Sequence, residues 1–170
     1  MNEGFNRRSR EHRQDLAGEY RWGDLGQNIL LIVFIVGMVA DVFLVKISSW
    51  QDVIPWYFRV VCFVPLFVFG WYVVQQAYKK VFQEERKGLE VITTGVYAWL
   101  RHPMYFGLLM IYLSFILLSL SVIALVIFGV AVIFYYYLCR YEEQLLIAKL
   151  GDEYKEYMMK VPMFIPRVKR

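Results

Sequence analysis

A stretch of 36 residues without a charged side chain, Met104 to Cys139, limits what this chain can fold into. As a single helix it would be ~54 Å long, whereas the hydrocarbon core of a bilayer is only ~30 Å thick. The stretch therefore has to fold back on itself. The Ser-Leu-Ser run at 119–121 is the most polar place near its middle. We predict two antiparallel spans there, 103–118 and 121–139, joined by a very tight turn.

Two further apolar segments come before this hairpin. They run from 29 to 45 and from 57 to 78, and Pro65 inside the second one predicts a kink. The hydrophobic share of the chain is 59%, above the ~45–50% of soluble proteins. The sequence predicts an all-α, multi-pass membrane protein with about four transmembrane helices.

The placement of basic residues indicates the orientation of these spans. Of the 19 Lys and Arg residues, 17 lie in the segments 1–28, 79–102 and 140–170. With four spans all three segments face the same side, which the positive-inside rule makes cytoplasmic. We predict a cytoplasmic N-terminal segment, 1–28, and a membrane domain, 29–170, with both termini cytoplasmic. Acidic residues are interleaved with the basic ones, so we expect no nucleic-acid partner.

The last span is expected to continue into the cytoplasm as an amphipathic helix. Gly151 is expected to break this helix, and Asp152 to cap a short second helix that stops before Pro162. Apolar side chains recur at three- and four-residue steps along this region, namely Leu146, Leu150, Tyr154, Tyr157 and Val161.

Several polar or reactive side chains within the spans allow two interpretations. Asp41 is either a functional group or, as we favour, an interfacial one close to the end of its span. Arg59 is expected to snorkel to the outer interface. The tyrosines at 135–137 form an aromatic belt or line a substrate entrance. The two cysteines, Cys62 and Cys139, have no metal-ligand spacing, so we expect buried thiols and no metal.

The hairpin brings two polar clusters together at the cytoplasmic interface. An Arg-His-Pro run at 101–103 precedes its first arm, and an Arg-Tyr-Glu-Glu run at 140–143 follows its second. Both arms rise about 24–27 Å, so their ends return to the same depth. Taken alone, each cluster is typical of an ordinary interfacial helix end, but their meeting favours a binding site.

Each cluster suits part of a charged, polyhydroxylated cofactor. Pro103 fits the first position of a helix, which leaves His102 at the cap. The N–H groups of Met104 and Tyr105 are then free to bind an anion such as a carboxylate. Two carboxylates of the second cluster are suitable acceptors for ribose hydroxyls or an ammonium group, namely those of Glu142 and Glu143.

The same segments resemble the isoprenylcysteine carboxyl methyltransferases, and the related phospholipid N-methyltransferases have a similar core. The resemblance rests on VITTGVYAWLRHPMYFG, followed by YEEQLLIAKLGDEYKEYMMKVPMFIP. Its parts are G-V-Y-x-x-x-R-H-P-x-Y-x-G, the Glu pair, and G-x-E-Y-x-x-Y ending in V-P. Together they cover 89–166, nearly half of the chain, in matching order and separation.

The resemblance implies S-adenosylmethionine (SAM) as cofactor, S-adenosylhomocysteine as product, and a lipid acceptor from the membrane. The implied cofactor contacts are Leu89, Val91, Ile92, Tyr97, His102, Pro103, Met104, Tyr105 and Glu142. One departure is that the arginine expected one turn before the Glu pair is Leu138 here. Arg140 or Arg101 is the alternative cation for a substrate carboxylate, and the catalytic candidates are Arg140, Arg101 and Glu143.

We therefore predict an integral membrane SAM-dependent methyltransferase for a lipid-like acceptor, with carboxyl O-methylation as the leading reaction. Phospholipid N-methylation, or methylation of a small lipophilic thiol or acid, is the alternative within the enzymes. A four-span transporter or scaffold is the alternative without chemistry. A transporter should carry an ionisable residue deep in a span, and only Asp41 comes close to this.

Overall fold

The computed structural model describes residues 21–45, 53–82 and 90–164, and the regular structure within these ranges is entirely helical, as predicted. Predictions for residues 1–20, for Leu89 and for the end of the 89–166 core lie outside the described residues. The elements are α2 (Arg21–Ala40), the π-helical turn η1 (Asp41–Val45), α3 (Trp56–Phe82), the 3-10 turn η3 (Gly95–Ala98), α4 (Pro103–Ser119), α5 (Val122–Leu150) and α6 (Asp152–Lys160).

Within the described residues, three helices are long and apolar enough to cross a membrane. They are Leu25–Val45, Trp56–Phe82 and Val122–Leu150. The fourth predicted span is α4, a shorter apolar helix of 17 residues, whose length of about 26 Å falls slightly below the thickness of the hydrocarbon core. The chain is therefore an all-α membrane protein, and α3 continues as a helix through Pro65.

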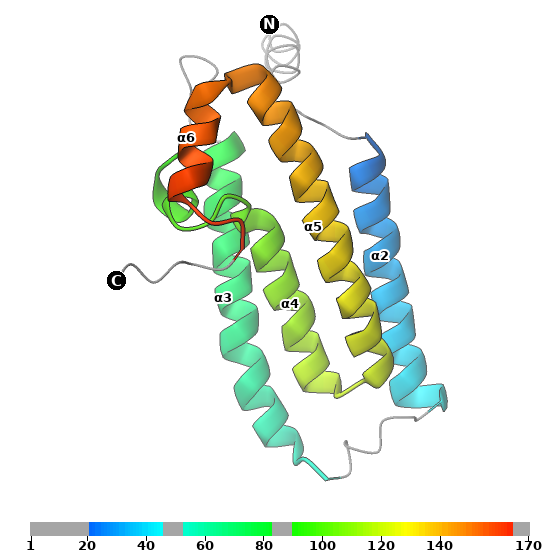
Figure 1. Ribbon diagram of the computed structural model, residues 1–170. Coiled ribbons are helices and arrows are strands. Elements are labelled where there is room, and N and C mark those ends of the chain that lie inside the picture. Colours follow the sequence, from blue (N-terminus) through cyan, green and yellow to red (C-terminus); the bar gives the residue numbers. More distant parts are fainter. Residues whose placement is uncertain (1–20, 46–52, 83–89, 165–170) are drawn as a thin grey trace, which may run out of the picture.

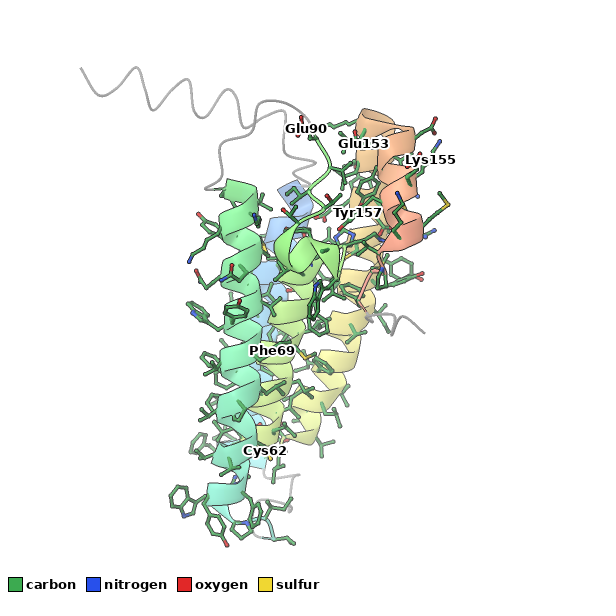
Figure 2. All side chains as sticks on the ribbon, turned by 90° about the vertical axis from the view of Figure 1, so that its left-hand side faces the viewer. Cys62, Phe69, Glu90, Glu153, Lys155 and Tyr157 are labelled. Carbon is green, nitrogen blue, oxygen red and sulfur yellow. The ribbon has the colours of Figure 1, made fainter. Side chains whose placement is uncertain are left out.

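Figure 1 shows α4 between α3 and α5, with α2 on the other side of α5, and the contacts between elements agree with this order. The start of α2, the end of α3, the start of α4 and the end of α5 lie at the same end of the bundle. Figure 2 shows Tyr157 and Glu153 of α6 at this end, and Cys62 of α3 near the opposite end. The hairpin thus returns to the depth from which it started, as the sequence predicts.

Helices α3 and α4 approach closely at two glycines. A Cβ atom on Gly107 would lie 2.8 Å from the carbonyl oxygen of Gly70, and a Cβ on Gly70 would lie 2.8 Å from the carbonyl oxygen of Gly107. Small residues allow helix backbones to approach closely in a membrane, where packing and not water drives association. This contact holds the first turns of α4, and therefore the start of the candidate site, against α3.

The tight turn of the hairpin forms where the polar run predicted it. Leu120 adopts a left-handed conformation with φ 52°, and its N–H donates to the carbonyl of Ile116. Ser121 caps α5 by accepting from the N–H of Ala124 at 3.1 Å. Because one residue in this conformation reverses the chain, α4 and α5 pack as direct neighbours.

Asp41 is buried against this turn, which differs from its expected place at an interface. Its side chain is 0% exposed. The carboxylate accepts from the hydroxyl of Ser121 at 2.6 Å and from the N–H of Ile123 at 3.2 Å. A buried carboxylate has to be hydrogen-bonded, and here it adds a second cap to α5. Asp41 therefore fastens the end of α2 to the hairpin.

Candidate functional site

The candidate site begins at the first turn of α4. Pro103 occupies the first helical position and His102 the N-cap, as the sequence predicts, and the carbonyl of His102 accepts from the N–H of Phe106 at 3.1 Å. Helix geometry leaves the N–H groups of Met104 and Tyr105 without partners inside the helix. These two groups and the positive end of α4 make this turn suitable for an anion.

His102 lies between the two carboxylates of α5. Its Nδ1 is 3.5 Å from Oε2 of Glu142, and its Nε2 is 3.3 Å from Oε1 of Glu143. Burial lowers the pKa of His102, but hydrogen bonds with the Cys139 thiol and both carboxylates outweigh it and hold the pKa well above its usual range. The imidazole thus lies between the two carboxylates of α5, with its Nε2 hydrogen-bonded to Glu143.

Tyr105 connects the first turn of α4 to Glu142 as well. Its hydroxyl donates to Oε1 of Glu142, and its ring stacks on that of Tyr135 with centroids 5.2 Å apart. The side chain of Glu142 is 25% exposed, whereas that of Glu143 is only 2% exposed. Glu142 is therefore the member of the pair that a bound molecule can reach.

Arg101 is engaged with the C-terminal segment. Its Nη1 donates to the carbonyls of Met158 at 2.9 Å and Val161 at 3.0 Å, and its own N–H donates to the carbonyl of Pro162 at 2.9 Å. Its Nε lies 2.8 Å from Oε1 of Glu143. These contacts tie the end of α6 to the start of α4, and they occupy the guanidinium.

The other two catalytic candidates differ in their surroundings. Glu143 is buried, and its Oε2 has no hydrogen-bond partner among the described residues. Arg140 lies on the same helix with an exposed side chain. The structure thus brings Glu143 and Arg101 together and leaves Arg140 exposed.

The segment before α4 forms one wall of the site. Gly95 opens η3 with φ 65°, a conformation that side chains other than glycine rarely adopt. The carbonyl of Tyr97 accepts from the hydroxyl of Tyr157 at 2.6 Å, and the N–H of Val91 donates to Glu153 of α6 at 3.4 Å. Three residues of this wall are half-buried, namely Val91, Ile92 and Tyr97. Helix α6 therefore covers the wall only in part.

A cavity in the membrane part of the bundle adjoins these residues. It has a volume of about 410 Å³ and lies between α2 and α4. Tyr135 and Tyr112 line it, and Tyr135 also stacks on Tyr105. A continuous set of aromatic side chains therefore connects the cavity to Glu142. The sequence allowed Tyr135 as an entrance residue, but it offered no signal for Tyr112.

Cys139 was also missed as a neighbour of the site. Its thiol is buried, and its proximity helps to raise the pKa of His102. Its position one helical turn before Glu143 is the signal that places it on the same face of α5.

Comparisons with known proteins find similarity to methyltransferases. The model of the family described as "Phospholipid methyltransferase" matches residues 54–153, more than half of the chain. A methanethiol S-methyltransferase of Crocosphaera subtropica is 28% identical over 121 residues, which are 62% of this chain and 47% of that protein. The protein-S-isoprenylcysteine O-methyltransferase of Saccharomyces cerevisiae is 40% identical over 78 residues, 45% of this chain and 32% of that protein.

A third relative is the protein-S-isoprenylcysteine O-methyltransferase of Schizosaccharomyces pombe. It is 32% identical over 79 residues, which are 46% of this chain and 34% of that protein. The chain thus spans less than half the length of each of these curated relatives. No solved structure matches the chain with significance.

Proposed function

The chain belongs to the phospholipid methyltransferase family, and from that premise we propose that it is an integral membrane methyltransferase that uses SAM. The reaction is the transfer of a methyl group to a lipid-like acceptor, with a carboxyl O-methylation as in the isoprenylcysteine enzymes as the leading case. In this proposal 29–170 is the catalytic membrane domain and 89–166 its cofactor core. Segment 1–28 and both termini are cytoplasmic.

One observation carries the proposal: the two ends of the hairpin meet in a polar, partly buried cluster. His102 and Glu142 are 40 positions apart in sequence, yet their side-chain atoms approach to 3.5 Å. Tyr105 adds a hydrogen bond to the same carboxylate. His102 and Glu143 are buried in this cluster, and burying ionisable groups costs free energy, which argues for a binding role.

The residues present fit SAM. The positive first turn of α4, with the N–H groups of Met104 and Tyr105, suits the carboxylate of its amino acid part. Glu142 offers acceptors for ribose hydroxyls or for the ammonium group. The remaining contacts of the proposed cofactor site are Leu89, Val91, Ile92, Tyr97, His102 and Pro103.

When bound, the cofactor supplies an electrophilic methyl group on a sulfonium. The chain's own contribution is to hold it, to orient the acceptor and to exclude water. A carboxylate acceptor and a sulfonium both lose charge in the transition state, so a site of low dielectric favours the transfer. The buried tyrosines and the apolar cavity provide this environment. Arg140, the exposed cation on α5, is proposed to orient an acceptor carboxylate, because Arg101 is already bound to carbonyl groups.

The cavity between α2 and α4 supports a lipid-like acceptor. Its lining is mostly apolar, it opens within the membrane part of the bundle, and at about 410 Å³ it has the size of a small-ligand pocket. A small lipophilic thiol is the second candidate acceptor, because the relative with the longest of the three matches is named a methanethiol S-methyltransferase. Phospholipid N-methylation is the third, after the description of the family.

Cofactor binding tests the proposal first. The purified protein in detergent should gain thermal stability with S-adenosylhomocysteine, and Glu142→Ala should abolish the gain. Gln144→Ala, an exposed position two residues further along the same helix, is the matched control and should keep it. No stabilisation of the unmodified protein at millimolar ligand would instead support a transporter or scaffold.

Methyl transfer tests the acceptor. Labelled methyl from SAM should appear on one class among S-prenylated cysteines, aminophospholipids and lipophilic thiols. Leu31 lines the cavity, whereas its neighbour Ile32 does not line it and is 60% exposed. Leu31→Trp should therefore raise KM for the acceptor while Ile32→Trp leaves it unchanged. Equal kinetics of the two variants would rule out this cavity as the acceptor site.

A further inference from the structure

Arg59 lies at the end of the bundle opposite to the candidate site, in a second cavity. This cavity has a volume of about 280 Å³ and is lined by side chains of η1 and of α2, α3 and α4. Apart from Arg59 and Ser119, its lining is apolar: Met38, Val39, Val42, Phe43, Phe115 and Leu118. A guanidinium in such a place is unusual, because charged groups in membrane spans have a partner or a function.

The hydrogen bonds of Arg59 are incomplete. Its Nη1 donates to the carbonyl of Leu118 at 3.3 Å, a long bond. Its Nε is buried and has no hydrogen-bond partner among the described residues. A guanidinium carries five N–H donors and binds phosphate or carboxylate through two of them at once. The guanidinium is thus turned toward the other helices of the bundle.

The surroundings indicate which anion fits. Trp56 and Tyr57, both exposed, begin α3 one turn before Arg59, and such aromatic residues gather at the headgroup level of a bilayer. Asp41, the acid next to Val42 in sequence, already accepts hydrogen bonds from Ser121 and Ile123. Arg59 therefore faces an apolar groove at the depth where lipid phosphates lie.

We propose that this groove is a binding site for a membrane glycerophospholipid, with its phosphate on Arg59 and one acyl chain between α2 and α4. The acyl chain has room to extend toward the middle of the membrane, because Met38 and Phe115 line both this cavity and the larger one. The bound lipid connects α2 to α3 and α4 at the end of the bundle where Asp41 also fastens α2.

Lipid-dependent stability of the delipidated full chain in detergent tests this proposal. Phosphatidylglycerol should raise the melting temperature, and diacylglycerol with the same chains but no phosphate should not. Arg59→Gln should weaken binding of phosphatidylglycerol roughly tenfold to a hundredfold, the usual effect of losing a charge-assisted pair. Lys79→Gln, an exposed charge at the other end of α3, is the matched control and should bind as the unmodified chain does.

Other outcomes identify other occupants. Inorganic phosphate that stabilises as well as the lipid, or diacylglycerol that does so, would overturn the proposal. Unchanged lipid affinity in Arg59→Gln would also overturn it. Should Arg59→Gln not fold, Val39→Trp fills the groove and keeps the arginine, with the exposed Val36→Trp beside it as control. Val39→Trp should lose lipid binding and Val36→Trp should keep it, whereas both variants should still bind S-adenosylhomocysteine.

Discussion

The contact between α3 and α4 allows a quantitative test with Gly107→Ala. The added Cβ would lie 2.7 Å from Cγ2 of Val74, 2.8 Å from the carbonyl oxygen of Gly70 and 3.1 Å from the backbone nitrogen of Val74. The side chain of Val74 has some freedom to move, but the two backbone atoms do not. To reach ordinary van der Waals distances, the two helices have to separate by about half an ångström, which forfeits part of their dispersion contact.

The free energies can be compared with those of a second glycine. Overpacking of this kind costs about 1–3 kcal/mol, while alanine is about 1 kcal/mol better than glycine inside a helix. A Cβ on Gly129 of α5 meets no atom within 4 Å, so Gly129→Ala gains the propensity without the clash. Because the propensity gain is common to both variants, Gly107→Ala should be less stable than Gly129→Ala by about 1–3 kcal/mol.

The assay is thermal or denaturant unfolding of both variants in the same detergent. Gly107 is also one turn from Pro103, so its displacement from α3 shifts the start of α4 relative to α5. Gly107→Ala should therefore bind S-adenosylhomocysteine more weakly, whereas Gly129→Ala should bind it normally. Equal stability of the two variants would refute the close approach of α3 and α4 at this point.

Three further predictions concern buried polar groups. Asp41→Ala should lower the free energy of unfolding by about 1–3 kcal/mol, because two donors lose their acceptor, whereas the exposed Asp152→Ala should change it by less than about 0.5 kcal/mol. The raised pKa of His102 means that its protonated form stabilises the folded state. This contribution is complete at pH below about 6.5, the pKa of an unfolded histidine, and it is lost as pH rises through the higher pKa of the folded state. The free energy of unfolding should therefore fall between these two pKa values. His102→Gln should flatten this dependence of stability on pH. Arg101→Met should remove one of the two cations beside the buried Glu143 and two hydrogen bonds to carbonyls. It should cost about 3–5 kcal/mol and make α6 more sensitive to trypsin; unchanged digestion would show that Arg101 does not tether the C-terminal segment.

The sequence alone was sufficient to predict the helical hairpin and the meeting of its two ends. A charge-free run too long for one span has to reverse, and the Ser-Leu-Ser run marks the only polar point near its middle. Pro103 determines where α4 begins, so the spacing of His102 and Glu142 predicts their contact. These features depend on the residue types along the chain and on the thickness of a bilayer, and neither requires knowledge of how distant segments pack.

The partners of the buried charges were decided by the tertiary structure. Arg101 and Arg140 are equivalent as cations in the sequence, yet one is bound to backbone carbonyls of the C-terminal segment and the other is exposed. Asp41 bonds to a turn 80 positions away. The order of the helices, and with it the two cavities, follows in the same way from which helices pack together. A sequence shows which groups need a partner, but only packing between distant segments determines which partner comes within reach.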